Sequence, residues 1–129
     1  SKIPMAEDPK ERRKFARLDI ALTVAYSVRN PGGEPSPMVE ATSGDISAGG
    51  LRLMTPSLLE NGATLDLEIF LGEEMEAPIH GVGEVVWQTK ISNTSFETGI
   101  FLKHVENDDK KRIMSFVFDQ MAKLVGLNQ

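Results

Sequence analysis

Apolar residues occupy every second position of residues 18–29 in this 129-residue chain. The apolar series consists of Leu18, Ile20, Leu22, Val24, Tyr26 and Val28. Side chains of an extended chain point alternately to opposite faces, so this period of two predicts a strand with one buried face.

Five further short strands are expected after the first one. They cover residues 38–46, 50–54, 65–71, 79–88 and 96–102. The breaks between them are turn-rich: "NPGGEPSP" at 30–37, Asn61-Gly62, the region of Gly72, and a loop around "KISNTS" at 90–95. Glycine, proline and asparagine at such spacing are typical of hairpins in an antiparallel sheet.

The last part of the chain changes to the period of a helix. Asn107 or Asp108 is a suitable N-cap, and Gly126 suits the helix end. The apolar stripe contains Ile113, Phe116, Val117, Met121 and Leu124, and Gln120 lies within it. Such a stripe must pack on another element, most simply an open end or face of a barrel.

The sequence therefore predicts an all-β protein: a six-stranded antiparallel (split) β-barrel with a C-terminal α-helix. A closed barrel leaves no exposed sheet edge, which favours it over an open sheet. Residues 1–11 contain Pro4 and Pro9 without an apolar period, and we expect a flexible N-terminal arm there. Residues 12–129 are expected to form one domain.

Charge is unevenly distributed in a chain of formal net charge -5. Residues 10–17 hold five of the fourteen Lys and Arg residues and one of the nineteen Asp and Glu residues. The rest of the chain consequently carries nine basic and eighteen acidic residues, a net charge of -9. A long polyanion would be repelled by that body, whereas a small anion can be bound locally. We therefore expect a small ligand and no nucleic acid.

Catalysis and metal binding are not expected from the residue pattern. The chain has no cysteine, and His80 and His104 lack the spacing of metal ligands. No histidine or lysine is placed by sequence to activate Ser47 as a nucleophile. Trp87 is interpreted as a core or barrel-rim residue, although a tryptophan near a binding surface can stack on a base. We expect neither an enzyme nor a cofactor.

No apolar run reaches the roughly 20 residues that a membrane-spanning helix needs. No signal-peptide pattern opens the chain. Together with the absence of cysteine, these features lead us to expect a cytoplasmic protein without membrane insertion.

Two short stretches are candidate binding motifs. "RRKFAR" at 12–17 contains Arg12, Arg13 and Arg17, whose planar guanidinium groups match phosphate oxygens and the guanine O6/N7 edge. Taken alone, it is equally well a solvated basic segment.

The second stretch, "GDISAGGLRL" at 44–53, places Asp45 and Ser47 on one face of an extended backbone. Gly49 and Gly50 permit positive φ and the close approach of a flat ligand. Taken alone, it is best explained as an ordinary hairpin.

In combination, Arg13-xxx-Arg17 before the first strand and Asp45-x-Ser47-x-x-Gly50 between the next two resemble the signature of PilZ domains. The resemblance extends over essentially the whole chain. It implies a six-stranded barrel that binds the bacterial second messenger cyclic di-GMP.

By position, the resemblance assigns Arg13 and Arg17 to phosphates and guanine edges, with Arg12 as an extra contact. It assigns Asp45 and Ser47 to guanine or ribose, and Gly49 and Gly50 to leaving room for the ligand. We expect binding to order residues 10–17 against the barrel and so to signal to an effector protein of unknown identity, in motility, biofilm or secretion.

Two other functions remain open at this point. One is a nucleotide-independent adaptor whose barrel or helix docks a protein partner. The other is a weak electrostatic arm for anionic membranes or nucleic acid, which the net charge of -9 on the body disfavours.

Overall fold

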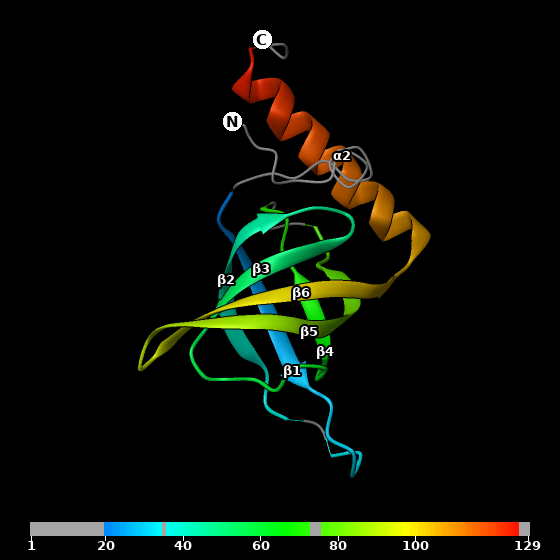
Figure 1. Cartoon of the computed structure of the whole chain (residues 1–129). Helices are drawn as coiled ribbons and strands as arrows, with labels where there is room; N and C mark the ends of the chain where they lie inside the picture. Colours follow the sequence, from blue (N-terminus) through cyan, green and yellow to red (C-terminus); the bar gives the residue numbers. More distant parts are fainter. Residues whose placement is uncertain (1–19, 35, 73–75, 127–129) are drawn as a thin grey trace.

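The computed structural model describes residues 20–34, 36–72 and 76–126 of the chain. Within these residues, six antiparallel strands close into a barrel and one helix follows the last strand (Figure 1). The elements are β1 (Leu22–Val28), β2 (Val39–Ile46), β3 (Gly50–Thr55), β4 (Thr64–Ile69), β5 (Ile79–Ser92), β6 (Ser95–Val105) and α2 (Asn107–Leu124). The expected fold class is confirmed.

Each strand is hydrogen-bonded to two neighbours, in the order β1-β2-β3-β6-β5-β4 around the barrel. β1 closes the ring because it pairs with both β2 and β4: Tyr26 faces Val39 on one side and Leu67 on the other. Closure satisfies the backbone groups that an edge strand would leave unpaired. Closure also couples the pairing registers of all six strands, since a slip of one strand would change its pairing with both neighbours.

The prediction of a loop around residues 90–95 is wrong. The structure continues β5 to Ser92 and begins β6 at Ser95, so only Asn93 and Thr94 connect the two strands. This hairpin extends beyond the other strands (Figure 1), and its β5 arm is largely exposed on both faces from Val86 to Ser92. A strand without a buried face shows no alternation of apolar and polar residues, which explains why the pattern predicted a loop. The first strand also begins later than expected, at Leu22.

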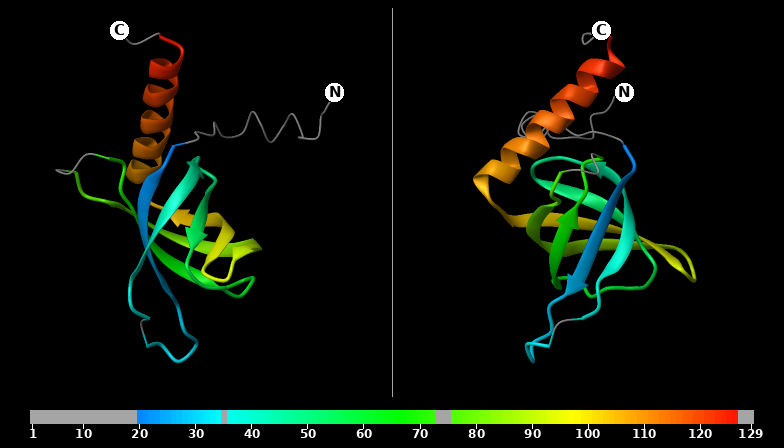
Figure 2. Two further views of the ribbon diagram at one scale, coloured as in Figure 1. Left: turned by 90° about the vertical axis from the view of Figure 1, so that its left-hand side faces the viewer. Right: turned by 180° about the vertical axis from the view of Figure 1, so that it is seen from behind.

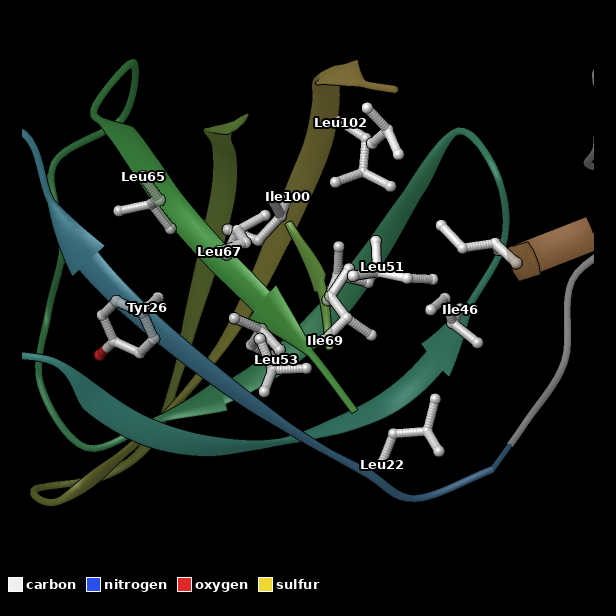
Figure 3. Packing of buried hydrophobic residues seen from close by; sticks show 14 of the residues in the cluster. Leu22, Tyr26, Ile46, Leu51, Leu53, Leu65, Leu67, Ile69, Ile100 and Leu102 are labelled. Atoms are coloured by element: carbon white, nitrogen blue, oxygen red, sulfur yellow. The ribbon is translucent and has the colours of Figure 1, made fainter. Parts of the chain in front are cut away.

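The barrel interior is filled by the apolar residues of the alternating pattern. Leu65, Leu67 and Ile69 of β4 point inward, where they meet residues of the opposite wall such as Leu53 and Ile100 (Figure 3). All five side chains are at most 3% exposed. The period-two prediction therefore identified the core correctly.

The helix α2 packs on one end of the barrel, as expected (Figure 2). Ile113 and Val117 are 0% and 2% exposed and belong to the core cluster. Gly126 has φ +75°, which confirms the expected helix end.

The helix start differs from the prediction of Asn107 or Asp108 as N-cap. Glu106 is the N-cap, without a side-chain capping hydrogen bond, and Asn107 and Asp108 already lie in the helix. β6 runs to Val105, so a single residue separates strand from helix and the cap moves forward. Asp108 and Asp109 in the first turn interact favourably with the helix dipole instead.

An ion pair joins β4 to the residue that follows β1. The Arg29 guanidinium donates to both oxygens of Asp66, at distances of 2.7 to 3.2 Å. Hydrogen bonding to Arg29 lowers the pKa of Asp66 below its ordinary value. A carboxyl group with a lowered pKa in the folded state stabilises the fold above its ordinary pKa, and this contribution is lost as the pH falls.

We expect Asp66→Asn to reduce the free energy of unfolding near neutral pH but not in acid. The difference from the wild type should be fully present above the ordinary carboxyl pKa of about 4 and should be lost as the pH falls from there through the lowered pKa of folded Asp66. Chemical denaturation of both proteins at several pH values checks this. A difference that persists unchanged in acid would show that Asp66 acts through packing and not through its charge.

Docking of α2 on the barrel can be tested with two adjacent residues. Ile113→Ala should lower the free energy of unfolding by about 2–5 kcal/mol, because it leaves a cavity between helix and barrel. Met114→Ala is the matched control, since Met114 is 57% exposed, and its effect should stay within about 0.5 kcal/mol. Equal effects in urea denaturation would contradict the observed packing.

Candidate functional site

The residues of the second motif lie together at the β2–β3 connection. Asp45 is near the end of β2, Gly50 begins β3, and Ser47 and Gly49 lie in the tight turn between them. Arg12, Arg13 and Arg17 lie outside the described residues. The structure thus brings together four of the seven predicted site residues, and their clustering follows directly from the hairpin.

Ser47 holds the turn in shape. Its backbone N–H donates to the Gly50 carbonyl at 3.0 Å, and its hydroxyl accepts from the Gly49 N–H at 3.2 Å. The hydroxyl also donates to the Gly50 carbonyl at 3.4 Å. Ser47 is only 6% exposed. In this conformation its hydroxyl therefore positions the backbone of the turn.

The two glycines do not use the conformational freedom expected of them. Among the described residues, positive φ is found at Gly33, Gly62, Gly72 and Gly126, and not at Gly49 or Gly50.

Gly50 is instead required by packing. A Cβ there would lie 2.5 Å from the carbonyl oxygen of Ile100 on β6. The adjacent Gly49 carbonyl accepts from the Leu102 N–H at 3.0 Å. The backbone of the turn thus packs directly against the backbone of β6.

Asp45 is 8% exposed and lies opposite an arginine that the sequence reasoning missed. Nη2 of Arg52 is 3.4 Å from Oδ2 of Asp45, and Nη1 is 3.1 Å from Oε2 of Glu97. A signal for this contact was present in the sequence. In a hairpin with two residues between Ser47 and Gly50, Asp45 must face Arg52.

The cross-strand register aligns Asp45 with residues of three further strands. Asp45 on β2 faces Arg52 on β3, Arg52 faces Gly99 on β6, and Gly99 faces Trp87 on β5. A Cβ on Gly99 would overlap the indole ring, so Trp87 lies over Gly99. Trp87 is 41% exposed. Neighbouring strands are about 4.8 Å apart, which puts Trp87 about 14 Å from Asp45 along the barrel surface.

A groove of about 610 Å³ borders this row of residues, a volume in the range of small-molecule sites. Gly44, Arg52 and Glu97 contribute polar groups to its lining, and Leu53 and Met54 contribute apolar ones. Asp45 and Ser47 do not line it. The groove therefore lies beside the motif and not within it.

The first described residue, Ile20, lies at the same end of the barrel as the motif. β1 pairs with β2 with Leu22 opposite Ser43 and Thr23 opposite Thr42. Continuing this antiparallel register leads from Leu22 toward Ile20 and from Ser43 toward Asp45. The chain that carries the three arginines therefore joins β1 beside the Asp45–Gly50 turn.

The remaining polar candidates do not form a reactive cluster. His80 is 3.8 Å from Glu68, and His104, which lies within β6 and not after it as expected, is 3.4 Å from Glu106. Both histidines are exposed. In the described part of the chain, no group of three or more His, Cys, Asp or Glu residues is placed to hold a metal ion. No helix in the same part is long and apolar enough to cross a membrane.

Gly50→Ala tests the packing of the turn on β6. The added methyl group meets the Ile100 carbonyl, and we expect a loss of about 1–3 kcal/mol in the free energy of unfolding. Gly32→Ala is the control, because a Cβ at Gly32 meets no atom within 4 Å, and its effect should stay within about 0.5 kcal/mol. Thermal and urea denaturation measure both. An undiminished stability of Gly50→Ala would show that the turn has room to move away from β6.

Comparison with known proteins identifies related sequences and folds. The family model described as "PilZ domain" matches residues 11–119. No curated protein matches the chain.

Several solved structures are similar. The inhibitor of motility MotI/DgrA of Bacillus subtilis superposes with a TM-score of 0.71 at 21% identity, over 87% of this chain and 52% of that one. The PilZ domain of YcgR from Escherichia coli, solved with c-di-GMP, gives 0.62 at 13% identity, over 92% and 99%. The MrkH–c-di-GMP complex of K. pneumonia gives 0.55 at 23% identity, over 88% and 54%. The chain thus spans about half the length of MotI/DgrA and MrkH.

Proposed function

The chain belongs to the PilZ domain family, and on that premise we propose that it is a receptor for cyclic di-GMP. The observation that carries the proposal is the Asp45–Gly50 turn at the barrel end where the arginine-bearing segment joins β1. Two similar structures, YcgR and MrkH, are described with c-di-GMP. The proposed site consists of Arg12, Arg13, Arg17, Asp45, Ser47, Gly49 and Gly50.

Chain connectivity limits how far the arginines can lie from the turn. Arg17 is three residues from Ile20, so its Cα lies within about 11 Å of the Ile20 Cα, and Arg13 lies within about 25 Å. The long arginine side chains extend this range further. Both guanidinium groups are therefore able to reach a ligand that rests on the Asp45–Gly50 turn.

The two halves of the proposed site offer complementary chemistry. Arg13 and Arg17 supply positive charge in a fork geometry for the two phosphates. Asp45 is an acceptor for the N1 and N2 donors of guanine, which adenine does not present. Trp87 is exposed on the same row and offers a face on which a base can stack. This combination selects a small dianion with guanine bases.

Binding of the ligand is proposed to act as a switch without catalysis. A ligand held between the turn and residues 10–17 restricts that segment and changes the surface beside the barrel. An effector protein that recognises the changed surface would then transmit the signal. We place this activity in the cytoplasm, where a soluble second messenger is available to the protein.

Titration calorimetry with cyclic di-GMP tests the proposal. Arg13→Ala should weaken binding by about 5- to 150-fold, since one bidentate arginine contact contributes roughly 1–3 kcal/mol. Arg29→Ala is the matched control, because Arg29 follows the opposite end of β1 and pairs with Asp66. Trp87 is the only tryptophan, so its fluorescence gives a second readout from the proposed surface.

Equal affinities of the wild type and Arg13→Ala would remove the arginine segment from the site. Absence of binding to the wild type would reject the receptor proposal itself.

A second candidate function is a nucleotide-independent adaptor. It is favoured by the exposed apolar side chains of α2 and the residue after it, namely Met114, Phe118, Leu124 and Val125, which are 57% to 77% exposed. An exposed apolar stripe of this kind is typical of an interaction surface. This function predicts capture of a protein partner that is unaffected by cyclic di-GMP.

A further inference from the structure

Arg52 links two carboxylates that come from the strands on either side of it. Its guanidinium lies 3.4 Å from Asp45 of β2 and 3.1 Å from Glu97 of β6. The Asp45 side chain is 11% exposed, whereas that of Arg52 is 37% exposed. The arginine therefore sits at the boundary between the buried carboxylate and solvent, held from both sides.

Gly44 provides the surface on which this guanidinium rests. A Cβ at Gly44 would lie 3.3 Å from Nη2 and 3.4 Å from Nε of Arg52, closer than an ordinary contact. The β2–β3 register shifts between Ser43 and Asp45, so Gly44 lies at a bulge. Bulges change the direction of the side chains that follow them. Here the hairpin places Asp45 opposite Arg52, the register changes at Gly44, and the absence of a side chain at Gly44 leaves space for the arginine.

We propose that Arg52 is a positioning residue that orients the Asp45 carboxylate for the guanine edge. This inference rests on the proposed binding of cyclic di-GMP. Among the described residues, Arg52 forms the ion pair with the Asp45 carboxylate, through Oδ2. Each carboxylate oxygen has two lone pairs, so Asp45 remains able to accept from a guanine donor while it is ion-paired with Arg52.

Orientation matters because the terminal torsion of aspartate has a broad energy profile. Without Arg52, the carboxylate rotates and meets the ligand in the productive direction less often. Glu97 in turn fixes the arginine from β6.

The competing role for Arg52 is direct contact with a phosphate of the ligand. The two roles differ in what they do to base selectivity and salt dependence. A positioning residue acts through the guanine-reading carboxylate, so its loss lowers the preference for guanine over adenine. A phosphate contact carries no base information, and its loss weakens all cyclic dinucleotides equally while reducing the salt dependence of binding.

The test measures the affinities of the full chain for cyclic di-GMP and cyclic di-AMP at two salt concentrations. We expect Arg52→Ala to weaken cyclic di-GMP binding about tenfold, equivalent to about 1.4 kcal/mol, with cyclic di-AMP binding and the salt dependence unchanged. Arg52→Lys should restore part of the preference for guanine. Glu97→Gln, which keeps the size of the side chain, should cause an intermediate loss. Arg29→Ala again serves as the arginine control.

Gly44→Ala provides a variant that leaves every charge in place. Its added methyl group displaces the guanidinium, and it should reproduce the loss of guanine preference. Thermal unfolding midpoints show that each variant is folded.

Wild-type affinity in Arg52→Ala would overturn the inference and leave the receptor proposal intact. Equal weakening of both dinucleotides with a smaller salt dependence would also overturn it, in favour of a phosphate contact. A wild-type protein that does not bind cyclic di-GMP would reject both proposals.

Discussion

The close approach of the Ser47–Gly50 turn to β6 is the constraint on which the candidate site depends. Gly50 leaves no space for a side chain against the Ile100 carbonyl, and the Gly49 carbonyl is bonded to Leu102. These contacts fix the turn against β6, while the Ser47 hydroxyl fixes its shape through hydrogen bonds to Gly49 and Gly50. The result is a rigid support at one end of the barrel for Asp45.

Barrel closure extends this constraint to residues far apart in the sequence. Because each strand pairs with two others, the register of the β2–β3 hairpin determines which residues of β6 and β5 share its row. Gly99 and Trp87 share the row of Asp45 only because of this pairing, whereas Arg52 is placed there by the hairpin itself. Strand pairing thus determines which residues surround the motif. The positive charge of Arg52 in this surface is paired with the carboxylates of both Asp45 and Glu97.

Charge is divided between the acidic barrel and the basic segment that precedes it in the sequence. An acidic barrel disfavours long polyanions, and a basic stretch at residues 10–17 precedes β1 in the sequence. The chain belongs to the PilZ domain family, and its fold is similar to those of YcgR, MotI/DgrA and MrkH. The contribution of this chain's own structure is the Asp45–Arg52–Glu97 network, which connects the proposed ligand surface to β6.

By itself, the sequence determined the class of fold, the core and the motif that forms the turn. Alternation in β1 and β4, the asparagine-glycine turn and the apolar stripe of the helix each depend on neighbours a few residues away, so local pattern was sufficient for them. The β5–β6 hairpin and the helix cap were predicted wrongly, because an exposed strand has no alternation and because the length of β6 decides where the helix begins. Only the tertiary structure decided the role of Gly50 and the surroundings of Asp45. Contacts with Ile100, Glu97 and Trp87 join strands that are distant in sequence, and their register is set by closure of the whole barrel.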